Sequence, residues 1–239
     1  MSDSAGSLAA RVLGVLRSPR TTFETIARAP SWLGVVTLTL LVTTGCTAVL
    51  LETDVGQLAL LDQWERTASA FGRTIDDDRY AAMEDASRHG AAYAVLSSLA
   101  GGPLLAVGLA GLFFASFRAA APGAVTSAVT YRQVFAVVAH AGVILALRQV
   151  IAAPIAYARE TLSSPMTLGM FTMLDEGSWP ARFLGLIDLF VLWWIVVLAI
   201  GVSVLYGRPV QRLAGLFVGA YVTLVIVLTV VIAMTGGTA

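Results

Sequence analysis

Charge is scarce in this chain, and several residue types that usually carry chemistry are nearly missing. Only 13% of the 239 residues are charged, against roughly 25% in soluble proteins, and no lysine is present because all 15 basic residues are arginine. The formal net charge is zero, so the sequence carries no electrostatic footprint for nucleic acid. The single Cys46 excludes an intrachain disulfide, and its apolar surroundings favour a small buried hydrophobe over a metal ligand or thiol nucleophile.

Recognisable catalytic motifs are also missing. The sequence contains no nucleophile elbow, Walker loop, HExxH motif or CxxC pair. We therefore expect no enzymatic activity, no cofactor and no metal site. Of the two histidines, His89 lies in a polar loop and is expected to be a solvated side chain.

Long apolar segments dominate what the chain does contain, with 57% hydrophobic residues and a mean hydropathy of +0.81. Residues 183–206 hold one charge, Asp188, and as a helix would extend about 36 Å, beyond the roughly 30 Å hydrocarbon core of a bilayer. The sequence thus predicts an all-α polytopic protein of the cell membrane, in which residues 31–239 form one domain of five transmembrane helices. The predicted spans are about 32–51, 91–117, 131–157, 183–206 and 213–234.

Residues 1–30 precede the first span and are predicted to form an amphipathic segment on the cytoplasmic side. Apolar residues recur at helical spacing in two short pieces, and Ser18-Pro19 between them is the favoured order for a helix start. Four arginines, Arg11, Arg17, Arg20 and Arg28, suit a segment that lies on anionic headgroups. The alternative interpretation is a solvated basic tail.

A polar excursion, residues 52–90, separates the first two spans. Apolar residues recur at helical spacing in its first half, at Leu58, Leu61, Trp64, Ala68 and Phe71. We expect this helix to lie on the membrane surface. Asp76, Asp77 and Asp78 then open a second helix, 79–88, which could run on into the second span. These acids are either a cation site or, as we favour, caps of a helix N-terminus.

The second span contains Gly101-Gly102-Pro103, and a kink or break of the helix is expected there. Broken helices expose backbone groups to substrates in some transporters. A kink that serves packing is the favoured interpretation.

Polar residues inside the third and fourth spans are the candidate site: Gln133, His140, Arg148 and Asp188. Gln133 and His140 share one helix face, and Arg148 lies at the edge of that stripe. Because the two spans are antiparallel, Arg148 and Asp188 reach similar depths, and we predict an ion pair of about 4 Å or less between them. Either the pair fixes helix register or it belongs to a functional polar site. For His140, a hydrogen-bonded bundle residue is favoured over a proton relay or metal ligand.

Three stretches of sequence resemble the bacterial Yip1-domain proteins: Leu184–Trp193 continuing to Leu198–Gly201, Ser18-Pro19-Arg20-x-x-Phe23, and Tyr131–Val137. The resemblance implies a five-helix membrane fold with a cytoplasmic N-terminal region. Eukaryotic relatives act in vesicle traffic with small prenylated GTPases, whereas bacterial ones have no settled activity. Nothing in this sequence supplies a GTPase partner.

Arginine placement predicts a cytoplasmic N-terminus and a C-terminus on the opposite side, since the inner segments hold eight arginines against Asp3 and Glu24. Two functions remain open. The chain is either a non-catalytic Yip1-type membrane protein, acting through partner proteins, a second copy of itself or the organisation of the bilayer, or a small transporter or channel lined by the candidate site.

Overall fold

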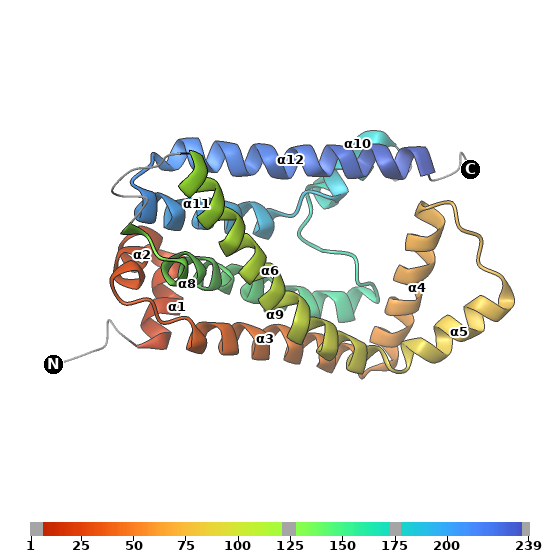
Figure 1. Ribbon diagram of the computed structural model, residues 1–239. Coiled ribbons are helices and arrows are strands. Elements are labelled where there is room, and N and C mark those ends of the chain that lie inside the picture. The colour runs from red at the N-terminus through yellow and green to blue at the C-terminus, as the bar shows by residue number, and fades with distance from the viewer. Residues whose placement is uncertain (1–6, 121–127, 173–177, 236–239) are drawn as a thin grey trace. The chain divides into compact units, whose positions relative to one another are not determined.

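The computed structural model describes residues 7–120, 128–172 and 178–235, which are predominantly helical (Figure 1). Five helical segments are long and apolar enough to cross a membrane, which confirms the predicted fold class. They are α3 (Leu33–Leu51), α6 (Gly90–Ala120), α8 (Tyr131–Ala141) continued by α9 (Val143–Arg159), α11 (Leu189–Tyr206) and α12 (Val210–Thr235). Gly142 between α8 and α9 keeps right-handed helical backbone angles, so the two form one span.

The chain divides into two compact units, and each is described by itself. The first unit comprises the described parts of residues 1–42, 98–147 and 190–219, and the second comprises those of 43–97, 148–189 and 220–239. The first unit holds the main hydrophobic core, in which α8 and α11 are the central elements. Val134, Val137, Ile144, Val197 and Val202 are fully or almost fully buried there.

Two short helices, α1 (Leu8–Arg17) and α2 (Pro19–Arg28), form the N-terminal pair. The predicted restart is confirmed, because Ser18 is the N-cap residue and Pro19 the first residue of α2. The apolar face, however, lies against protein: Val15, Phe23 and Ile26 are almost completely buried in the core of the first unit. An interfacial amphipathic segment, as expected from the sequence, would instead bury that face in the bilayer. A position of the arginine-bearing faces at the membrane surface stays a prediction.

The excursion folds as two helices, α4 (Asp54–Ala70) and α5 (Asp77–Ser87). The capping role of the acidic run is confirmed, since the Asp76 carboxylate accepts a hydrogen bond of 2.9 Å from the backbone N–H of Arg79. Helix α5 ends before α6 begins, so the two do not form one helix.

Of the two outcomes expected at Gly101-Gly102-Pro103, the break is wrong, because α6 is helical throughout this stretch, and the favoured kink stays a prediction. Proline removes one hydrogen bond, the one that the carbonyl of Leu99 would accept, while the bonds of the adjoining turns remain. No atom outside the adjoining helix backbone lies within 4 Å of the position that a Cβ of Gly101 would occupy. A Cβ of Gly102 would meet a methyl group of Leu40 at an ordinary distance of 3.6 Å. Crowding therefore does not force the helix open.

The fourth span begins later than predicted. A short helix, α10 (Trp179–Gly185), precedes it, and residues 186–188 are not helical. Their backbone pairs with the loop before the 3₁₀ helix η2 (Leu168–Phe171): Leu168 N–H donates to the Ile187 carbonyl, and Leu189 N–H donates to the Met166 carbonyl. These bonds hold the chain extended at Asp188. Consequently, Asp188 lies immediately before α11 and not inside it.

Candidate functional site

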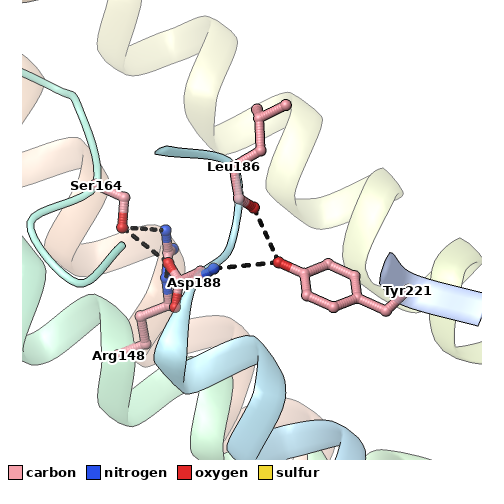
Figure 2. A network of polar contacts seen from close by, with 5 residues as sticks. All are labelled: Arg148, Ser164, Leu186, Asp188 and Tyr221. Atoms are coloured by element: carbon pink, nitrogen blue, oxygen red, sulfur yellow. Dashed lines mark hydrogen bonds and ion pairs between the residues drawn. The ribbon is translucent and has the colours of Figure 1, made fainter. Parts of the chain in front are cut away.

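The second unit contains a network of polar contacts centred on Arg148 and Asp188 (Figure 2). The Arg148 Nε donates to Asp188 Oδ2 at 2.7 Å, so the predicted ion pair is confirmed. Ser164 joins both partners, because its hydroxyl accepts from Arg148 Nη2 at 3.1 Å and donates to Asp188 Oδ2 at 2.8 Å. The Asp188 side chain is 8% exposed and that of Arg148 is 29% exposed.

Tyr221 of α12 fixes the backbone that carries Asp188. Its hydroxyl donates to the Leu186 carbonyl at 3.0 Å and accepts from the Asp188 N–H at 3.1 Å (Figure 2). The Tyr221 hydroxyl thus supplies both a donor and an acceptor to residues 186–188, which lie outside the helical hydrogen-bond pattern. This matters at membrane depth, where an unsatisfied backbone group costs several kcal/mol.

The network brings four segments of the second unit together: α9, the loop that contains Ser164, the linker at residues 186–188, and α12. A carboxylate and a guanidinium in direct contact offset each other's desolvation, and the serine hydroxyl adds hydrogen bonds to both. The arrangement supplies a neutral, directional cross-link. It holds no group poised as a nucleophile, since the serine hydroxyl faces a carboxylate and an arginine and no histidine.

Gln133 and His140 belong to the first unit and have contacts of their own. Gln133 completes a capping box with Thr130 at the start of α8, and its Nε2 donates to the Ala27 carbonyl of α2 at 2.9 Å. His140 is fully buried, with Nδ1 2.7 Å from the Ala136 carbonyl. The contact of Nδ1 confirms the favoured interpretation of His140 as a hydrogen-bonded bundle residue. The other ring nitrogen, Nε2, has no hydrogen-bond partner among the described residues.

Reasoning from the sequence missed Ser164 and Tyr221. Tyr221 places a hydroxyl in the uncharged stretch 213–234 of the fifth span, which was a usable signal. Ser164 lies in a loop whose path depends on tertiary pairing, so the sequence offered no signal for it. A further polar contact in the second unit joins α9 to α3, where Gln149 Nε2 donates to Thr47 Oγ1 at 3.0 Å.

A family model, the Yip1 domain, matches residues 13–232, which is nearly the whole chain. No curated protein and no solved structure matches it.

Proposed function

This chain belongs to the Yip1 domain family, and from that membership we propose that it works as a non-catalytic integral membrane protein, through protein partners or by organising the bilayer. The lipid bilayer is the environment that its five apolar spans require. The proposal places it in the cell membrane, with the N-terminus in the cytoplasm and the C-terminus on the opposite side.

The observation that carries the proposal is that the membrane-embedded charges are already satisfied within the protein. Arg148 and Asp188 bind each other and share Ser164. A transport site needs polar groups that can exchange their partners for a cargo. The pair therefore supports a structural role better than a role in transport.

The charge of the first unit supports a role at a membrane surface. Its described residues hold eight arginines against one carboxylate, Glu24. The arginines are Arg11, Arg17, Arg20, Arg28, Arg118, Arg132, Arg208 and Arg212. Cytoplasmic loops typically carry such an excess, and the cytoplasmic leaflet attracts it. The N-terminal pair presents part of this charge on exposed faces, with the Arg20 side chain 74% exposed.

Transport is a second candidate, and two observations favour it. The chain between α10 and α11 is not helical at residues 186–188, and discontinuous helices mark the binding sites of many transporters. In addition, His140 keeps a buried nitrogen without a partner among the described residues.

A reconstitution experiment tests the two functions against each other. The purified chain would be placed in liposomes, and proton and ion flux would be measured beside vesicle shape by electron microscopy. We expect flux equal to that of protein-free liposomes, together with altered vesicle shape. In cells, a photo-reactive residue at position 20 should crosslink lipid or a partner protein, whereas one at the buried position 15 should not. Flux that disappears in an Arg148→Gln, Asp188→Asn double variant would overturn the proposal in favour of transport.

A further inference from the structure

A cleft of about 480 Å³ lies between α4 and α5 in the second unit. Its walls combine two kinds of side chain. Trp64, Phe71 and Met83 supply apolar surface, and Arg73 and Arg79 supply positive charge. Phe71 is 45% exposed although it is a large hydrophobic residue, so the apolar wall is accessible. A site of this composition suits a ligand with an anionic end and an apolar end.

The two arginines of the cleft differ from the other two arginines of this hairpin. Arg66 pairs with Asp62 at 2.6 Å and Arg88 pairs with Glu84 at 3.3 Å, each one helical turn away. Within the described ranges, the side chains of Arg73 and Arg79 form no ion pair. The nearby Asp76 carboxylate is engaged instead by the backbone N–H of Arg79. Two guanidinium groups are therefore available at one cleft.

The hairpin lies where membrane-spanning helices of the second unit end. Thr53, which follows the end of α3 after the single residue Glu52, caps α4. Leu60 of α4 lies against Gly90, the first residue of α6, and the Ala70 carbonyl accepts a hydrogen bond from Thr235, the last residue of α12. Because α4 contacts the ends of α6 and α12, its expected depth is that of the lipid headgroups, where Trp64 is also favoured.

We propose that this cleft binds the headgroup phosphate of a phospholipid from the leaflet in which α3 ends. Arg73 and Arg79 hold the phosphate, since guanidinium forks match its oxygens. Trp64 and Phe71 cover the glycerol and the first acyl carbons. The site goes beyond the proposed function and does not depend on it.

A phospholipid fits the cleft better than a soluble anion does. The hairpin carries more carboxylates than arginines, including Asp77, Asp78 and Asp85, and these repel anions that approach from water. A phospholipid is already concentrated in the adjoining leaflet and gains contact with the apolar wall, whereas inorganic phosphate gains neither.

Native mass spectrometry of the full-length protein in detergent tests the site. The probes are phosphatidylglycerol, diacylglycerol as the same apolar body without phosphate, and inorganic phosphate. The variant is Arg73→Gln, Arg79→Gln. Its matched control is Arg66→Gln, Arg88→Gln, which removes the same charge from the same hairpin and breaks two exposed ion pairs of little energetic weight. Circular dichroism checks that all forms are equally helical.

We expect phosphatidylglycerol to bind the wild type and the control alike, and to bind the cleft variant at least about tenfold more weakly, because two charge-assisted contacts are lost. Equal weakening in the control would show that general charge attraction is responsible. Equal binding of diacylglycerol would show an apolar groove only, and competition by inorganic phosphate would show a free anion site. Each of these three results would overturn the proposal.

Discussion

A buried ion pair is stable only when both of its charges stay together. Arg148 and Asp188 meet at 2.7 Å and share Ser164, so each charge is compensated at a depth where water is scarce. Loss of one partner leaves a charge that the surroundings cannot solvate, whereas loss of both leaves two neutral polar groups. The two kinds of change should therefore differ sharply.

Asp188→Asn or Arg148→Gln alone should destabilise the protein by about 3–5 kcal/mol, and the double variant should recover part of that loss. Thermal unfolding and folded yield in detergent measure both effects. Arg66→Gln, which breaks an exposed pair, is the control and should change stability little. A double variant as unstable as the worse single variant would contradict the coupling.

Tyr221→Phe removes one hydroxyl that bonds both the Leu186 carbonyl and the Asp188 N–H. Both backbone groups lie in the non-helical linker and would lose this partner, so we expect a loss of about 1–3 kcal/mol in unfolding free energy. Tyr157→Phe, at a 51% exposed position of α9, is the matched control and should be close to neutral. Equal behaviour of the two variants in thermal unfolding would exclude the clamp.

The sequence sufficed for the ion pair because only two charges lay deep within apolar segments. Each of these charges needs an opposite charge nearby, and the other one was the single candidate. The other contacts of the network could not be predicted from the sequence, for a physical reason. Asp188 was expected inside a helix, but the pairing of Ile187 and Leu189 with residues 166–168 ends the helix there, and such pairing between distant segments leaves no local pattern.

At the scale of elements, composition predicted the five spans because each requires a long apolar run. It did not predict what covers the N-terminal pair. Apolar spacing shows that a helix has an apolar face, but lipid and protein satisfy that face equally well. Here the covering element is protein, because Gly201 of α11 leaves room for the ring of Phe23. The Gly-Gly-Pro sequence at residues 101–103 likewise indicated a possible break of the helix, yet α6 continues through this stretch.

Gly201→Val should loosen the N-terminal pair. A side chain at this position would meet Val137 and the ring of Phe23, whose nearest carbons lie 3.3 Å from the position of a Cβ. We expect a loss of about 1–3 kcal/mol and faster proteolysis of α1 and α2. Gly215→Val in α12 is the control, because open space surrounds that glycine within the chain. Equal protease sensitivity of the two variants would show that Phe23 does not depend on Gly201.

At the scale of the whole molecule, charge is divided unevenly between the units. The described residues of the first unit hold eight arginines and one carboxylate, whereas those of the second hold more carboxylates than arginines. An excess of arginine is typical of cytoplasmic segments, so this uneven charge bears on orientation. Net charge of the whole chain, which is zero, hides it.

The N-terminus should therefore be cytoplasmic, and the α4–α5 hairpin should face the opposite side, because basic segments are retained in the cytoplasm during insertion. Labelling of single cysteines tests this in a Cys46→Ala background. A maleimide that cannot cross membranes should label Asp78→Cys in intact cells, but Arg20→Cys only after permeabilisation. Both positions are exposed, so accessibility to the reagent does not depend on unfolding. A third site, Arg208→Cys between α11 and α12, should behave like position 20, since an odd number of spans separates it from position 78. Labelling of position 20 or 208 in intact cells would contradict the predicted orientation.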